Sequence, residues 1–142
     1  MIWCEKIAEK VEGEQLINDS KTPSGRAHVG ALRGVLIHDA VFRAIQAKGT
    51  PVRYTFGVDD YDPLDELPAG QEEFFRPYLG TPLCNVPPPP GSSFSDISEH
   101  YIQDFFSVFK DLHVSAETYR LRDIYRSGRF NEVIEDLSLI HI

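Results

Sequence analysis

Polar and apolar positions follow two different periods along the first part of the chain, and they predict a strand, a helix and a second strand in succession. Residues 14–20 are short and partly apolar, as in a strand that leads into a loop. Across residues 29–47 the apolar positions recur every three to four residues, which is the period of a helix with one buried face. Lys48 and Gly49 are typical of a helix C-terminus, and residues 52–58 are β-branched and aromatic, as in a second strand. The helical apolar positions are Val29, Leu32, Leu36, Ala40, Ala44 and Ala47.

The second half of the chain predicts a continuation of this alternation. A helix is expected to begin near Ser95 or Ser98, either of which can cap it, and residues 116–121 are expected to form a third strand. Short helices are expected over residues 123–128 and from Phe130 onward. The central helix carries an apolar stripe that we expect to pack on the sheet, namely Tyr101, Phe105, Val108, Phe109 and Leu112.

Most of the prolines fall between these halves, in residues 63–95, and they include the run 87–90. Proline lacks an N–H donor and cannot continue a helix or a central strand, so an irregular connection is expected here. A strand, helix and strand in this order form a right-handed unit with parallel strands. The sequence therefore predicts an α/β fold with a parallel sheet and flanking helices.

The loop and helix start in residues 22–33 are the strongest chemical signal. The first turn of a helix has N–H groups without partners, and together with the helix dipole they attract an anion. Gly25 and Gly30 have no Cβ to block a ligand, Pro23 pre-sets one dihedral of the loop, and His28 can donate to a phosphate oxygen. We expect a nucleotide phosphate here. The simpler alternative is a common loop followed by a capping histidine.

Three carboxylates follow the second strand at the edge where this loop lies, and they are Asp59, Asp60 and Asp62. Ligands of parallel sheets bind at the carboxyl ends of the strands, so these groups are expected to face the same cleft as the loop. They are suited to a cationic substrate or to a magnesium ion bound through water. The alternative is that they only cap a turn, which is a common role for Asp.

Composition restricts the class of protein. With 142 residues, of which 42% are hydrophobic, the chain can bury one modest core. Cys4 and Cys84 form no CxxC pair, so neither a zinc site nor a disulfide scaffold is expected, and reduced cytoplasmic thiols are the default. We expect a cytoplasmic protein because no apolar run has the length of a membrane span and no signal peptide is recognised.

The formal net charge of −8 predicts weak binding of this chain to RNA, because RNA binding depends on cationic contacts to phosphate. One basic cluster could approach an RNA end, although a solvated helix face is the favoured interpretation. Its members are Arg120, Arg122, Arg126 and Arg129.

The residues at the loop and at the second strand resemble the N-terminal part of class I lysyl-tRNA synthetases of the archaeal type. The resemblance rests on Thr-Pro-Ser-Gly at 22–25, His-Val-Gly at 28–30 and Asp-Asp-Tyr-Asp at 59–62. Further similar stretches occur in the same order, namely an opening helix with Trp3, residues 78–82 leading to 86–87, and the helix 99–112.

This resemblance implies the N-terminal half of a Rossmann-like class I catalytic domain, over residues 1–136, that activates lysine with ATP and transfers it to tRNA(Lys). Residues 28–31 occupy the place of the HxGH (HIGH) signature, although Ala31 stands where many class I enzymes have histidine. The resemblance implies catalytic roles for His28 and Gly30 and expects Mg²⁺ with the ATP. The implied ATP-binding residues are Pro23, Ser24, Gly25, His28, Val29, Gly30 and Ala31. The implied lysine-binding residues are Ser20, Thr22, Asp59, Asp60 and Asp62.

The family has further segments for which this sequence shows no counterpart, among them the KMSKS loop, zinc-binding insertions and an anticodon-reading domain. Residues 137–142 do not continue the family pattern and are expected to be a scar of a truncated reading frame, so the chain alone is expected to be inactive. Two alternatives remain. One is a different HxGH-type nucleotidyltransferase that adenylylates another small carboxylic acid, and the other is a nucleotide-binding module without catalysis.

Overall fold

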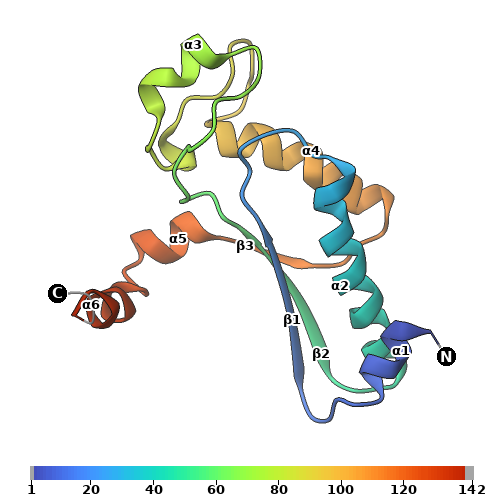
Figure 1. The fold of residues 1–142 in the computed structure, drawn as a ribbon. Coiled ribbons are helices and arrows are strands. Elements are labelled where there is room, and N and C mark those ends of the chain that lie inside the picture. Colours follow the sequence, from blue (N-terminus) through green and yellow to red (C-terminus); the bar gives the residue numbers. More distant parts are fainter. Residues whose placement is uncertain (1, 140–142) are drawn as a thin grey trace.

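A parallel sheet of three strands organises the molecule (Figure 1). The structure, a computed structural model, describes residues 2–139. The strands β1 (Gln15–Lys21), β2 (Val52–Val58) and β3 (Glu117–Arg120) are hydrogen-bonded in the order β1-β2-β3. All seven residues of β1 pair with β2, from Gln15 opposite Val52 to Lys21 opposite Val58. The predicted α/β fold with a parallel sheet is confirmed.

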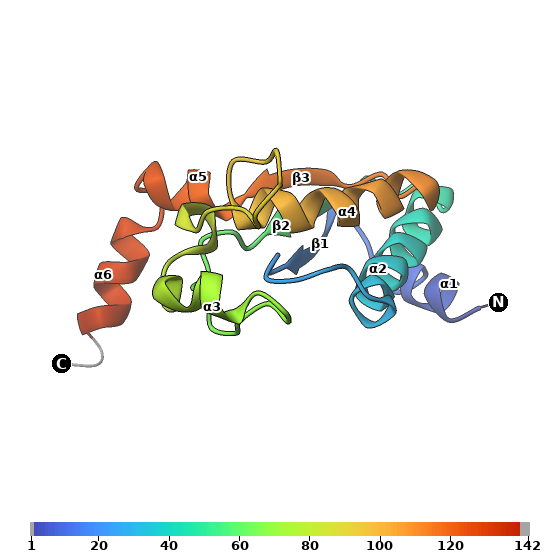
Figure 2. The same cartoon turned by 90° about the horizontal axis from the view of Figure 1, so that it is seen from above.

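Two long helices, α2 (Val29–Ala47) and α4 (Ile97–Asp111), cross from one strand to the next and share one core with β2 (Figures 1 and 2). Phe56 of β2 lies against Phe105 and Phe109 of α4, with ring centroids 5.7 and 4.9 Å apart. Val35 of α2 closes the same cluster. Burying each of these side chains stabilises the fold by about 1.5–3 kcal/mol, so this face of the sheet contributes much of the stability.

The predicted apolar stripe of α4 is only partly right. Tyr101, Phe105 and Phe109 are buried, but Leu112 is 42% exposed because it lies at the C-terminal cap, beyond the sheet. Ile102, which the spacing did not single out, is buried in the shared core. Leu112 instead lines an open apolar hollow with the short opening helix α1 (Trp3–Ala8) and with α2.

The N-cap of α4 is Asp96, and neither of the serines predicted for this role occupies it. The Asp96 carboxylate accepts the N–H of Glu99 at 2.9 Å, while the hydroxyls of Ser95 and Ser98 donate to that carboxylate. A carboxylate at this position satisfies a free N–H and interacts favourably with the helix dipole. The serines therefore support the cap.

The connection between β2 and α4 is more ordered than the prolines predicted. It contains α3 (Glu72–Phe75) and two 3₁₀ turns, η1 (Arg76–Tyr78) and η2 (Leu83–Asn85). These short elements surround a second core in which Leu64, Phe75, Leu83 and Val86 are fully buried. The spacing of these residues follows no regular period, which is why the sequence pattern did not reveal them.

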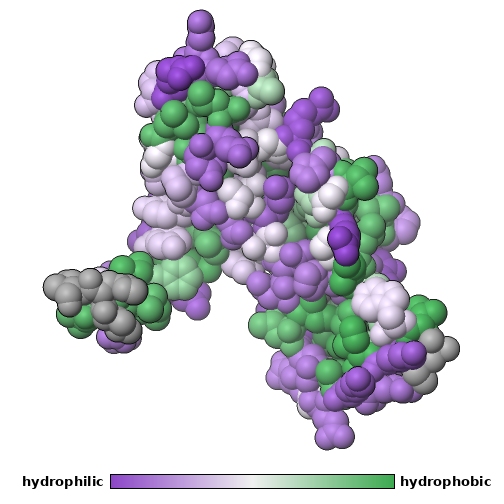
Figure 3. All heavy atoms as spheres, viewed as in Figure 1, coloured by the Kyte–Doolittle hydropathy of each residue, from purple (hydrophilic) through white to green (hydrophobic). Residues whose placement is uncertain are grey.

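The last elements are α5 (Leu121–Arg126) and α6 (Asn131–Leu139). Helix α5 starts two residues before the predicted boundary. Apolar residues of α6 lie on the surface (Figure 3), among them Val133 and Leu137, which are 54% and 55% exposed. Residues 137–139 belong to α6, residues 140–142 lie outside the described part, and the predicted scar stays a prediction. Among the described helices, none has the length and apolarity to span a membrane.

Replacing Gly57 by alanine is predicted to destabilise the fold. A Cβ at Gly57 would lie 2.7 Å from the Tyr119 hydroxyl oxygen, which donates a hydrogen bond to Asn18 at 3.0 Å. The Tyr119 ring would have to move and would lose this hydrogen bond. Overpacking of this kind lowers the free energy of unfolding by about 1–3 kcal/mol. Urea unfolding of G57A measures the loss. G25A is the control, because a Cβ there meets no atom within 4 Å. An equal loss for G57A in a Tyr119→Ala background would contradict this explanation.

Candidate functional site

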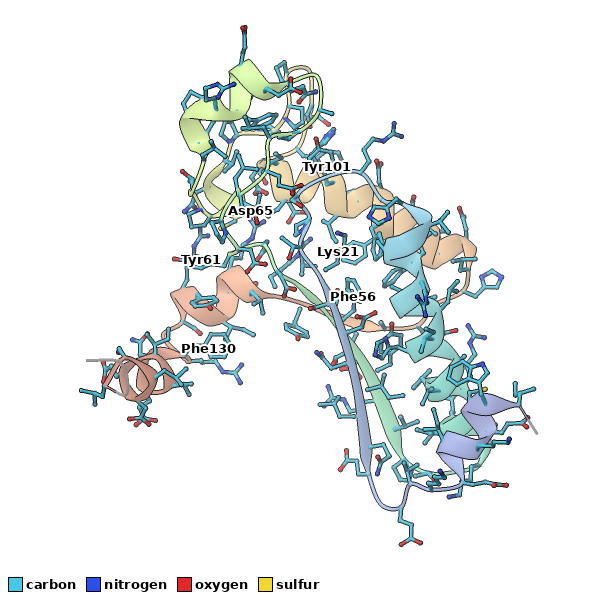
Figure 4. All side chains as sticks on the ribbon, in the orientation of Figure 1. Lys21, Phe56, Tyr61, Asp65, Tyr101 and Phe130 are labelled. Carbon is cyan, nitrogen blue, oxygen red and sulfur yellow. The ribbon has the colours of Figure 1, made fainter. Side chains whose placement is uncertain are left out.

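The carboxyl ends of β1 and β2 meet at one edge of the sheet and bring together side chains from both strand ends. The Asp59 N–H donates to the Lys21 carbonyl at 3.0 Å and so continues the strand pairing. Just beyond, the Thr22 hydroxyl donates to Asp62 Oδ2 at 2.7 Å. Figure 4 shows Lys21 at the end of β1 and Tyr61 in the segment that follows β2. The expectation that these two segments meet at one edge is confirmed.

Asp59 lies in a partly buried and strongly acidic part of this edge. Burial raises the pKa of its carboxyl above the usual value, a hydrogen bond with Ser20 opposes this, and the neighbouring charges of Asp62, Asp60 and Asp19 raise the pKa further. A carboxylate among other carboxylates gains when a cation arrives, because the cation relieves the like-charge repulsion. The edge is therefore suited to an ammonium group.

Asp60 is turned away from Asp59 and Asp62 and is fully buried. Its Oδ1 accepts a hydrogen bond from the backbone N–H of Arg122 at 2.7 Å, and its Oδ2 accepts one from Nε of the same guanidinium. The ligand role expected of Asp60 would require this ion pair to open. Removing one partner of a buried pair costs about 3–5 kcal/mol, so a structural role fits its position better.

Arg122 extends the pair into a buried network that joins the sheet edge to the start of α4. Its guanidinium also contacts both oxygens of Asp96, at 2.9 and 3.2 Å, as well as Ser98 and Glu99. Burial alone would raise the pKa of Asp96, but hydrogen bonds from Arg122 and Ser98 outweigh it and leave the pKa below its usual value. Burial would lower the pKa of Arg122, and its carboxylate partners raise it instead.

This network corrects the expectation of a solvated basic face. Arg120 and Arg122 have side chains only 21% and 15% exposed, and Arg120 pairs with Glu99 at 3.0 Å. Arg126 donates to Asn85 Oδ1 at 2.9 Å, and Arg129 is exposed to solvent. Sequence reasoning missed Arg122 because its partners lie 23 to 62 positions away.

The helix start places His28 at the N-cap of α2. Its Nδ1 accepts the N–H of Ala31 at 3.2 Å, so the capping alternative describes its observed contact. Because Nδ1 accepts, the neutral ring carries its proton on Nε2, which can donate to a ligand. Val29 and Gly30 are the first two helical residues, and their N–H groups have no carbonyl four residues earlier within the helix. Capping and anion binding are therefore compatible here.

Gly30 has a geometric reason to be small. A Cβ at this position would lie 3.0 Å from His28 Nδ1 and 3.1 Å from Cε1. Glycine thus lets the imidazole lie against the first turn while Nε2 stays accessible. Pro23 is buried, and the Ser24 N–H donates to the Thr22 carbonyl at 3.0 Å, which fixes the loop that leads to the helix.

A polar hollow adjoins this loop and has a volume of about 580 Å³. The loop, the segment after β2 and helix α4 each contribute to it. Within residues 2–139, the buried Gln71 Oε1 of this hollow has no hydrogen-bond partner. Tyr101, labelled on α4 in Figure 4, also lines the hollow. The lining residues are Gly25, Arg26, Pro68, Ala69, Gln71, His100, Tyr101 and Asp104. The hollow offers both donors and acceptors to a ligand held at the loop.

Among residues 2–139, no three His, Cys, Asp or Glu side chains are arranged to hold a metal ion.

Proteins of known family match nearly the whole chain. A family described as tRNA synthetases class I (K) matches residues 1–138. A lysine–tRNA ligase of Methanosarcina barkeri is 32% identical over 136 residues, which are 94% of this chain and 25% of that protein. A lysine–tRNA ligase of Methanocaldococcus jannaschii is 34% identical over 140 residues, which are 95% of this chain and 26% of that protein. The chain thus spans about a quarter of the length of the curated relatives it matches.

Proposed function

The chain belongs to the family of class I tRNA synthetases for lysine, and on this basis we propose that the complete protein activates lysine with ATP and transfers it to tRNA(Lys). The complete protein here means this chain together with whatever adjoins it in its gene. Family membership supports ATP as the substrate that supplies the energy. Both cysteines are free, as is usual in the reducing cytoplasm, which we propose as its compartment.

The observation that supports lysine best is the contact between the two strand ends. Thr22 holds Asp62 at 2.7 Å, and Ser20 lies against Asp59, so two carboxylates share one edge. Of the five lysine-binding residues expected from the sequence, we propose these four as the ammonium site. We propose that Asp60 has a structural role and does not bind the ammonium group, because both of its carboxylate oxygens already accept hydrogen bonds from Arg122.

The phosphates of ATP are proposed to lie at the start of α2. Lysine activation is the attack of its carboxylate on the α-phosphorus, which expels pyrophosphate. The pentavalent transition state gains negative charge on the phosphate oxygens, so fixed donors stabilise it more than the ground state. His28 Nε2 and the first-turn N–H groups of Val29 and Gly30 are such donors, and the 23–25 loop borders them. The Ala31 N–H donates to His28 Nδ1, so we propose that Ala31 supports the ATP site through the His28 cap.

Orientation is the second contribution. If the ammonium group is fixed at Asp59 and Asp62 while the phosphates are fixed at the helix start, the carboxylate and the α-phosphorus are held near each other. Such positioning replaces a bimolecular encounter and lowers the barrier without a covalent nucleophile on the protein. Mg²⁺ is proposed to accompany the ATP, with its ligands supplied by the phosphates.

Amino acid-dependent exchange of pyrophosphate into ATP tests the proposal. The complete protein is assayed with lysine, ornithine, arginine and small carboxylic acids, each with and without tRNA. Exchange that depends on lysine supports the proposed reaction. Exchange that depends on a different carboxylic acid would show that this acid, and not lysine, is the substrate. A folded, complete protein without any exchange would contradict the proposal and favour a nucleotide-binding module.

Two substitutions separate the capping role of His28 from its proposed phosphate contact. His28→Ala removes both and is expected to lower kcat for exchange about 100-fold and stability by about 1 kcal/mol. His28→Asn keeps a good N-cap acceptor, so stability is retained while the exchange rate stays low. Thermal unfolding and kcat are measured on the same samples. Wild-type exchange in the Asn variant would show that His28 only caps the helix.

The raised pKa of Asp59 predicts a pH dependence for lysine. As the pH falls, Asp59 takes up a proton at a pH that is still above the ordinary Asp pKa of about 3.9. An uncharged carboxyl binds an ammonium group weakly. The KM for lysine is therefore expected to rise on acidification, while the KM for ATP changes less. Asp59→Asn should raise the lysine KM by about tenfold or more and flatten this pH profile.

Asp65→Asn is the control for Asp59, because Asp65 lies exposed in the same segment. It is expected to keep the wild-type KM and the wild-type pH profile. A lysine KM that falls on acidification, or an Asp59→Asn variant with an unchanged profile, would rule out this role for Asp59.

A further inference from the structure

We propose that Arg122 is a positioning residue that sets the selectivity of the edge for its cationic substrate, because it holds the buried Asp60 and thereby fixes Asp59 and Asp62 on either side. This inference rests on the proposed function, and it adds a residue that touches neither lysine nor ATP. Arg122 comes from the start of α5, after the last strand, and so connects the substrate edge to a distant part of the chain.

The first step of the argument is the alternation of side chains in residues 59–62. Asp59 lies against Ser20, and Asp62 accepts the hydroxyl of Thr22, so both contact the end of β1. Asp60 between them points the other way and accepts two hydrogen bonds from Arg122. A rotation of the turn that released Asp60 would also move both outer carboxylates away from β1.

The second step concerns the backbone of the same turn. The Asp60 carbonyl accepts the Cys84 N–H at 2.8 Å, and the Asp62 carbonyl accepts the Leu83 N–H at 2.9 Å. Both donors belong to η2, so the turn is held from that side by the 63–95 connection. Arg122 holds the turn through its side chain, and this contact carries charge, whereas the two contacts from η2 do not. Arg120 adds a weaker ion pair, with its Nη1 at 4.0 Å from Asp60 Oδ2.

The third step is the geometry of the guanidinium. Arg122 contacts Asp60 after β2, Asp96 at the cap of α4, and Glu99 in its first turn. The planar guanidinium has five N–H donors and can hydrogen-bond to all of these partners at once, whereas a lysine ammonium is a compact point charge. The contacts with Asp96 and Ser98 fix the plane of the guanidinium, and that plane fixes Asp60.

The last step is the balance of charge. Arg122 neutralises Asp60, and the buried Asp60 would otherwise add its charge to that of Asp59 and Asp62 without being able to reach a ligand. With Arg122 in place, Asp59 and Asp62 are the two carboxylates of this turn that remain accessible to a substrate. Their separation then decides which cationic side chains fit, so loss of Arg122 should affect lysine and leave ATP, at the helix start, largely unaffected.

The test measures the KM of the complete protein for lysine and for ATP, together with kcat and the preference for lysine over ornithine, in pyrophosphate exchange. Arg122→Met is expected to raise the lysine KM about tenfold to a hundredfold and to reduce the preference over ornithine. The ATP KM is expected to stay within about twofold, since misplacement is confined to the carboxylate edge. Arg122→Lys should recover part of the loss, because it restores the charge but not the fork.

Two further variants keep the test decisive if Arg122→Met does not fold. Asp60→Asn retains the shape of Asp60 and is expected to reproduce the selective rise in lysine KM. Arg53→Met is the matched control, because Arg53 forms an exposed pair with Glu117 away from this edge. It is expected to leave both KM values unchanged.

The outcomes separate the two proposals. A folded wild-type protein without lysine-dependent exchange would overturn the proposed function itself. If the wild type uses lysine but the Arg122 and Asp60 variants lose only kcat, or raise both KM values equally, the function stands and the positioning role is wrong. A selective rise in lysine KM for Asp60→Asn, with partial recovery in Arg122→Lys relative to Arg122→Met, supports the role.

Discussion

The buried ion pair between Asp60 and Arg122 is the interaction on which the arrangement of the site depends. It joins the end of β2 to the start of α5, and through Asp96 it reaches the cap of α4. Two buried charges are tolerated only when hydrogen bonds satisfy them, and here Asp96, Ser98 and Glu99 accept the remaining hydrogen bonds of Arg122. Because the ion pair and these acceptors come from three separate elements, the site is a product of the whole fold.

A second constraint comes from the parallel sheet. Parallel strands end at the same edge, so the sheet alone brings Ser20 and Thr22 close to Asp59 and Asp62. The helix between those strands begins at the same edge and presents its N-terminus there. A region suited to a cation and one suited to an anion thus lie at the same edge, as the proposed activation of lysine by ATP requires. This juxtaposition links the fold to the proposed chemistry.

Local patterns predicted the regular part of the molecule, and long-range contacts account for what they missed. The helix over residues 29–47 and the strands around it have clear periods and were predicted with nearly the observed bounds. The second core around Phe75 has no period, so the connection over residues 63–95 was rightly predicted to be mostly irregular, but its short helical turns and its core were not predicted. Arg122 was grouped with surface charges, because nothing in its neighbourhood along the sequence indicates Asp60, 62 positions earlier. His28 was predicted both as a cap and as a phosphate donor, and the structure shows the cap.

The most direct measurement is a structure of the complete protein with a non-hydrolysable analogue of lysyl-adenylate. The ammonium group is expected within hydrogen-bond distance of Asp59 and Asp62, and the phosphate analogue at His28 and the first turn of α2, while Asp60 remains paired with Arg122. An analogue bound elsewhere on the sheet edge, or an ammonium group that displaces Arg122 from Asp60, would contradict the assignment of these carboxylates.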